Sequence, residues 1–139
     1  MATYVKYEPF IQFLVNEEVD FFGTEDTFRA VIHTDAPVVA TDDELADLTQ
    51  ITGTGYTAGG DDIQNNSTRS GGTVTMTAVD VVWTAGAADW SASARYVSIH
   101  DDTSTGDKLM CSYDYGATFA VGNGETFTLD FGATLATIA

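Results

Sequence analysis

Apolar and polar residues alternate in several short segments after residue 26, which is the spacing of strands that bury one face. Between Thr27 and Thr34, for example, Phe28, Ala30 and Ile32 fall on one face. The segments that carry such a pattern are 27–34, 71–84, 95–100, 108–113, 118–121 and 125–131. About six or seven short strands at this spacing are typical of a sandwich or barrel. We therefore predict a mainly β chain, an antiparallel β-sandwich or jelly-roll-like barrel with one or two short helices.

The alternation shifts by one residue within the segment 71–84. Apolar residues keep one phase up to Met76, and the pattern resumes at Val81 after a shift near Val79–Asp80. A β-bulge inserts one extra residue into a strand in this way. The pattern therefore predicts one long strand with a bulge at Val79–Asp80.

Helical spacing occurs near the N-terminus. Phe10, Phe13 and Leu14 recur at intervals of three and four residues, and Pro9 suits the first turn of a helix. We predict a short helix at this point. The alternative interpretation is an extended arm.

A second short helix is expected after Pro37. Thr41 is a favourable capping residue, and Glu44, three residues later, completes the capping-box pattern. Leu45, Leu48 and Ile51 would then lie on its buried side. The rise in glycine content after Ile51 predicts turns.

The chain has 139 residues, the commonest size for one domain. No internal repeat and no linker divides it. We predict a single domain in which 1–26 form the N-terminal helix or arm and 27–139 form the β-sandwich.

The charge balance is strongly acidic, with 21 Asp and Glu against 5 Lys and Arg and a formal net charge of −16. Such a surface repels nucleic acid and anionic lipid, because binding to either requires clustered cations. It favours solubility, divalent cations or a basic protein partner. The N-terminus lacks the pattern of a secretory signal, and no apolar stretch reaches the roughly 20 residues that span a bilayer. We expect a protein that is made in the cytoplasm and binds neither nucleic acid nor membrane.

The residues with reactive side chains are few. His33 and His100 are the only histidines, Cys111 is the only cysteine, and each lies on a predicted strand. Motifs for a serine nucleophile or a dithiol are missing from the sequence. We interpret both histidines as hydrogen-bonded structural residues and Cys111 as a small buried one. The sequence thus predicts no catalytic residue, no cofactor, no metal site and no enzyme activity.

One acidic loop is a candidate calcium site, because calcium binds clustered oxygen ligands. The loop from Asp101 to Asp107 offers such oxygens and contains Gly106, but Ser112 stands where a calcium helix-loop-helix has its bidentate Glu. We interpret the segment as a solvated hairpin loop. The alternative is an adventitious or interfacial cation.

The order of these strand-and-turn phrases is similar to that of a family of small proteins encoded among the structural genes of tailed phages. The phrases that carry the resemblance are DTFRAVIHTDAPVV (26–39), LADLTQITGTGYTAGG (45–60), SGGTVTMTAVDVVWTAG (70–86), ARYVSIHDDTSTGDKLMCSYDYG (94–116) and GETFTLDFGATLATIA (124–139). Family members often carry tryptophans before the Asp-Tyr-Gly phrase, where this chain has Ser112 and Tyr113.

This resemblance implies a virion component, and within that class a capsid decoration or cement protein. Such a protein binds the outside of the shell, often as a trimer, and stabilises contacts between major capsid subunits. The acidic charge suits the outer face, since the inner face meets DNA. Our candidate partner-binding residues are Tyr4, Tyr7, Phe10 and Phe13. The equal alternative is that these residues complete the core of the domain.

The second functional hypothesis is a tail-tip, fibre or receptor-binding component that contacts a host glycan or surface protein. Glycan pockets combine exposed aromatic rings with Asn or Asp side chains. Tyr56, Trp90 and Asn123 are the candidates for such a pocket.

Overall fold

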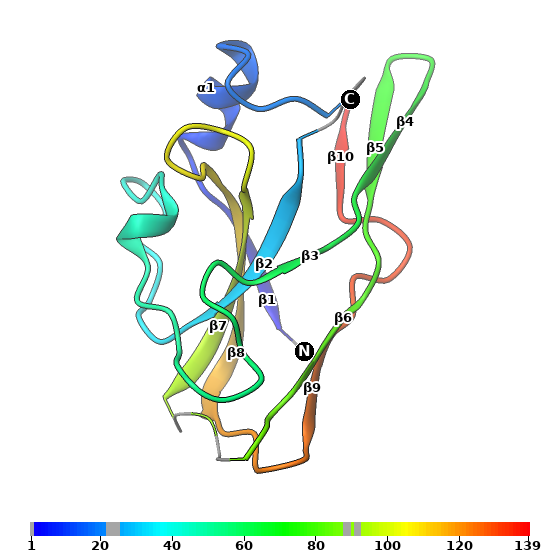
Figure 1. Cartoon of the computed structure of the whole chain (residues 1–139). Helices are drawn as coiled ribbons and strands as arrows, with labels where there is room; N and C mark the ends of the chain where they lie inside the picture. Colours follow the sequence, from blue (N-terminus) through cyan, green and yellow to red (C-terminus); the bar gives the residue numbers. More distant parts are fainter. Residues whose placement is uncertain (1, 22–25, 88–89, 91–92) are drawn as a thin grey trace.

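The computed structural model describes residues 2–21, 26–87, 90 and 93–139. The described residues form antiparallel β-sheets with little helix, which confirms the mainly β prediction. The largest sheet has five strands in the order β1-β8-β7-β2-β3 (Figure 1). Its strands are β1 (Thr3–Lys6), β8 (Leu109–Phe119), β7 (Ala94–Asp101), β2 (Phe28–His33) and β3 (Asp61–Asp62).

Two smaller sheets complete the β structure. One has the order β10-β5-β4, with β10 (Ala136–Ile138), β5 (Thr73–Thr77) and β4 (Asn66–Ser70). The other pairs β6 (Val81–Thr84) with β9 (Thr126–Leu129). Figure 1 shows β4 and β5 as a hairpin with β10 alongside β5, while β6 and β9 continue this side of the molecule.

The main hydrophobic core joins the large sheet to both small ones. It contains Phe28 and Ile99 from the large sheet, Met76 from β5 and Trp83 from β6, all at most 1% exposed. Each such side chain contributes about 1.5–3 kcal/mol when it leaves water. Facing sheets with a shared apolar interior are the arrangement of a sandwich.

The large sheet is covered on its second face as well. A smaller cluster of Tyr7, Val31, Leu48 and Leu109 lies there, with Val39 and Leu45 packed against it. The alternation predicted for 27–34 is therefore correct, but its second face is not solvated as the spacing suggested. The segment around residues 38–50 shields that face, which a strand's own sequence does not reveal.

The N-terminal segment is part of this architecture. Residues 3–6 form β1, which pairs with β8 from Thr3 opposite Asp114 to Lys6 opposite Cys111. The predicted short helix is present as α1 (Phe10–Val15), with Pro9 as the residue before it. Neither of the two alternatives for this segment, helix or arm, included the strand.

The bulge predicted near Val79–Asp80 is wrong. The chain leaves one sheet after Thr77 and enters another at Val81, so the phase of the pattern changes because the partner strands change. The backbone N–H of Val79 donates to Ile63, and the carboxylate of Asp80 accepts from the N–H of Phe131.

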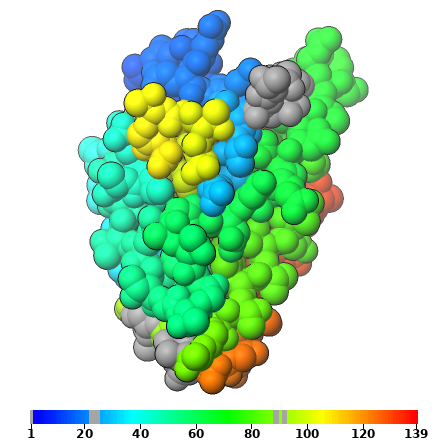
Figure 2. Space-filling view, in the orientation of Figure 1, coloured from blue at the N-terminus to red at the C-terminus, as the bar shows by residue number. Residues whose placement is uncertain are grey.

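The second predicted helix is a single 3₁₀ turn, Leu45–Asp47, and Thr41 does not cap it. The residue before the turn is Glu44, whose backbone N–H donates to Asp47 Oδ2 at 3.2 Å. The backbone N–H of Leu45 donates to the carbonyl of Asp107 at 3.0 Å. This bond ties the turn to the β7–β8 loop, and Figure 2 shows that loop in yellow beside this segment.

Candidate functional site

The structure places the four predicted partner-binding residues in two different environments. Tyr7, Phe10 and Phe13 are 0%, 3% and 7% exposed, whereas Tyr4 is 47% exposed. The three buried rings complete the core of the domain, which is the second of the two alternatives that the sequence left open. Of the four, Tyr4 alone presents substantial surface to a partner.

Tyr4 lies at a groove between the two ends of the chain, which we call the edge groove. It has a volume of about 530 Å³ and runs between β1, α1 and β10. Its apolar lining residues include Tyr4, Phe10, Ile11, Leu14, Leu135 and Ile138. Three of them remain open to solvent, with Tyr4 at 47%, Ile11 at 48% and Ile138 at 41% exposed.

Two sheet edges border this groove. β1 is the outer strand of the five-stranded sheet, and β10 is the outer strand of the three-stranded one. An outer strand carries N–H and C=O groups along one side that can pair with a further strand. The edge groove thus combines apolar surface with backbone hydrogen-bonding groups.

The acidic charge of the surface is only partly compensated within the chain. Among the described residues, Lys and Arg form ion pairs between Arg29 and Asp102 at 3.0 Å, Arg95 and Asp114 at 2.8 Å, and Lys108 and Glu44 at 2.8 Å. The Arg95 guanidinium lowers the pKa of Asp114 to about 2, so this carboxylate stays ionised. These pairs engage three of the 5 basic residues, whereas the sequence has 21 acidic ones.

His33 belongs to a buried polar network on the second face of the large sheet. Its Nε2 lies 2.8 Å from Ser98 Oγ, and the Tyr7 hydroxyl lies 3.0 Å from the same oxygen. Burial lowers the pKa of His33 despite the nearby Asp35, and burial raises the pKa of Tyr7 to about 12. His33 is thus a hydrogen-bonded core histidine, as the sequence predicted.

Cys111 is fully buried in the main core. Burial raises the pKa of its thiol to about 12, which keeps it protonated at neutral pH. A nucleophilic cysteine needs an exposed thiolate. The environment of Cys111 is that of a small buried residue, as expected from its strand.

Two of the aromatic residues assigned to a glycan pocket are not available. Trp90 is 2% exposed and its indole N–H donates to the carbonyl of Thr54 at 3.1 Å. Tyr56 is 9% exposed and its hydroxyl donates to Gln50. The proposed pocket of Tyr56, Trp90 and Asn123 is therefore wrong, because both aromatic rings are buried in the core although they lie in loops.

A second apolar hollow lies where the end of β8 meets β9, with a volume of about 810 Å³. Its aromatic rings pack mainly on one another. Phe119 and Phe127 stack with centroids 4.6 Å apart, and Tyr115 meets both rings edge-on. These side chains pack against the main core and extend it toward the surface.

The acidic loop after β7 is a hairpin loop, as predicted, but its first residue is not solvated. Asp101 is 0% exposed, and its Oδ1 accepts from the backbone N–H groups of Thr103 and Ser104. Burial, together with the neighbouring Asp26 carboxyl, raises the pKa of Asp101 to about 7. Asp101 therefore shapes the loop from inside, while Asp102 is exposed.

Comparison with protein-family models, with curated proteins and with solved structures found no match. Within the part of the chain that the structure describes, no helix is long and apolar enough to cross a membrane. The candidate functional site is therefore identified from the geometry of the described residues alone. It is the edge groove on an acidic, mainly β domain.

Proposed function

We propose that this protein is a structural component of a tailed-phage virion, and that it binds the outside of the capsid as a decoration or cement protein. The observation that carries the proposal is the edge groove, an open apolar surface bordered by two sheet edges. The resemblance of the strand-and-turn phrases to phage structural proteins supports the class. The proposed partner is the major capsid protein, with a trimer favoured for the bound form.

The groove suggests how docking would work. An extended segment of a capsid subunit would lie along β1 or β10 and form main-chain hydrogen bonds with the outer strand. Its apolar side chains would cover Tyr4, Ile11 and Ile138. Many such contacts on one particle add up through multivalency, even where each is weak.

The charge distribution supports the choice of partner and of face. A net charge of −16 disfavours contact with packaged DNA and opposes unassisted self-association in solution. It favours a capsid surface with exposed Lys and Arg around the docking segment. Because such attraction is screened by salt, binding should weaken as the salt concentration rises.

The test uses purified protein and phage shells that lack it. Addition of the protein should produce binding and raise the melting temperature of the shells, since a ligand of the assembled state stabilises it. Ile138→Asp should weaken binding by at least about tenfold, because it places a charge on a buried apolar contact.

Val82→Asp is the matched control, since Val82 is also an exposed strand residue, 58% accessible, but lies on β6. Deletion of the N-terminal residues is a poor test, because Phe10 and Phe13 belong to the core. Shells that neither bind the protein nor gain stability would contradict the decoration role. Equal binding by the two variants would exclude the edge groove as the docking surface.

A further inference from the structure

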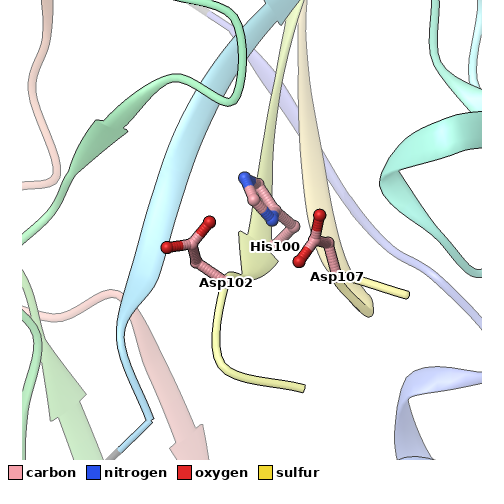
Figure 3. A group of neighbouring side chains, drawn as sticks. All are labelled: His100, Asp102 and Asp107. Carbon is pink, nitrogen blue, oxygen red and sulfur yellow. The ribbon is translucent and has the colours of Figure 1, made fainter. Parts of the chain in front are cut away.

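A histidine and two carboxylates meet where β7 runs into the β7–β8 loop. One ligand atom each from His100, Asp102 and Asp107 lies within 4.8 Å of the other two. Figure 3 shows the His100 ring between the two carboxylates, with the ring nitrogen nearer to the backbone on their side. The three residues come from the end of one strand and the two ends of a short loop.

His100 has an unusual hydrogen-bonding state. The side chain is 0% exposed, and its Nε2 lies 3.1 Å from the carbonyl oxygen of Gly59. A carbonyl oxygen can only accept, so Nε2 carries the proton and Nδ1 of the neutral ring carries a lone pair. That Nδ1 is buried and has no hydrogen-bond partner among the described residues.

A buried lone pair without a partner is unfavourable by about 1–3 kcal/mol, and such atoms are rare in folded proteins. The bond to Gly59 fixes the ring so that this lone pair faces the two carboxylates. Nearly every histidine that binds a metal ion is oriented in this way, by a hydrogen bond from its other ring nitrogen. The arrangement thus resembles a histidine prepared to accept a cation.

Contacts hold the carboxylate of Asp102 and the backbone of Asp107 in place. Asp102 Oδ2 contacts Arg29 Nε at 3.0 Å. Asp107 has a positive φ of 54° and donates its backbone N–H to Ser104. Arg29 offsets one of the two negative charges, so the cluster keeps a net negative charge with a neutral imidazole.

We propose that His100 Nδ1 and the carboxylates of Asp102 and Asp107 form a binding site for a divalent first-row transition cation, with Zn²⁺ as the reference ion. One imidazole and two carboxylates suit Zn²⁺ or Mn²⁺. Ca²⁺ takes six to eight oxygen ligands and is a poorer match. The bound ion would fasten the β7–β8 loop to the end of β7, and it would leave a coordination position for water or for a partner's side chain.

The site goes beyond the proposed assembly role and does not depend on it. The test is a Zn²⁺ titration of the full chain by calorimetry. Excess Mg²⁺ is present so that weak, non-specific binding to the surface carboxylates is already saturated. In parallel, NMR detects the ring nitrogens of the two histidines. We expect one saturable ion per chain, and a change in the Nδ1 resonance of His100 that His33, the internal reference, does not share.

Asp107→Asn is the diagnostic variant, because Asn tolerates a positive φ and keeps the loop geometry. It should weaken Zn²⁺ binding by more than about tenfold. Asp130→Asn is the matched control, an exposed residue outside this loop with the same change of charge. Binding that leaves His100 unchanged, equal affinities of the two variants, or no saturable binding would overturn the proposal.

Discussion

Gly59 and Gly60 provide a matched pair of substitutions that tests how the 59–60 turn packs on the large sheet. Both residues have positive φ, +90° and +73°. The carbonyl of Gly59 accepts from His100 Nε2, and the carbonyl of Gly60 accepts from Arg29 Nη1 at 2.8 Å. The same turn therefore supports His100 and Arg29, two residues at the proposed cation site.

The two glycines differ in the space around a methyl group. A Cβ on Gly59 would meet nothing within 4 Å, whereas a Cβ on Gly60 would lie 2.6 Å from the carbonyl carbon of Ala30 and closer still to its oxygen. Alanine at positive φ costs about 1–2 kcal/mol at either position. Overpacking against backbone adds about 1–3 kcal/mol at Gly60 alone.

We therefore expect Gly59→Ala to lower the free energy of unfolding by about 1–2 kcal/mol and Gly60→Ala to lower it by roughly 2–5 kcal/mol. Urea denaturation followed by tryptophan fluorescence measures both values. Equal losses for the two variants would refute the reasoning, because the packing of Gly60 against β2 would then have no energetic effect.

Three further expectations concern buried polar and thiol groups. Ser98→Ala removes the shared partner of Tyr7 and His33, and should reduce the free energy of unfolding in urea by about 2–4 kcal/mol. Burial holds the pKa of His33 in the folded protein below its ordinary value of 6.5. At a pH between the folded and the unfolded pKa, the unfolded chain therefore binds more protons than the folded one. The contribution of His33 to stability should thus be full above pH 6.5 and be lost as the pH falls below it. His33→Gln should reduce the rise of the unfolding free energy with pH in this range, and an unchanged pH dependence would contradict the assignment. Cys111 should react with a thiol reagent only as fast as the chain unfolds, whereas rapid reaction of the folded protein would show that the thiol is accessible.

The alternating segments predicted the strands at the centre of the molecule, because their apolar faces are long enough to mark a core. The outer strands β1, β4 and β10 were not predicted. β4 (Asn66–Ser70) contains only polar residues, and β1 and β10 are too short to show an alternation that distinguishes them from loops. Their pairing with β8 and β5 decides their conformation.

The edge groove could not be predicted because its parts lie at opposite ends of the chain. Aromatic spacing indicated the helix at Phe10 and Phe13, but which rings remain exposed depends on the strands packed against them. The acidic loop at Asp101–Asp107 was recognised from its composition. The lone pair of His100 Nδ1, which has no partner among the described residues, was not recognised, because the tautomer is set by the bond between Nε2 and Gly59, which lies 41 residues earlier.

Electron cryo-microscopy of tailed-phage particles mixed with this protein tests the proposed decoration role most directly. We expect its density on the outer surface of the shell, with a segment of a capsid subunit lying in the edge groove against β1 or β10. Density confined to the tail, or a groove that faces open solvent in the assembled particle, would contradict the account.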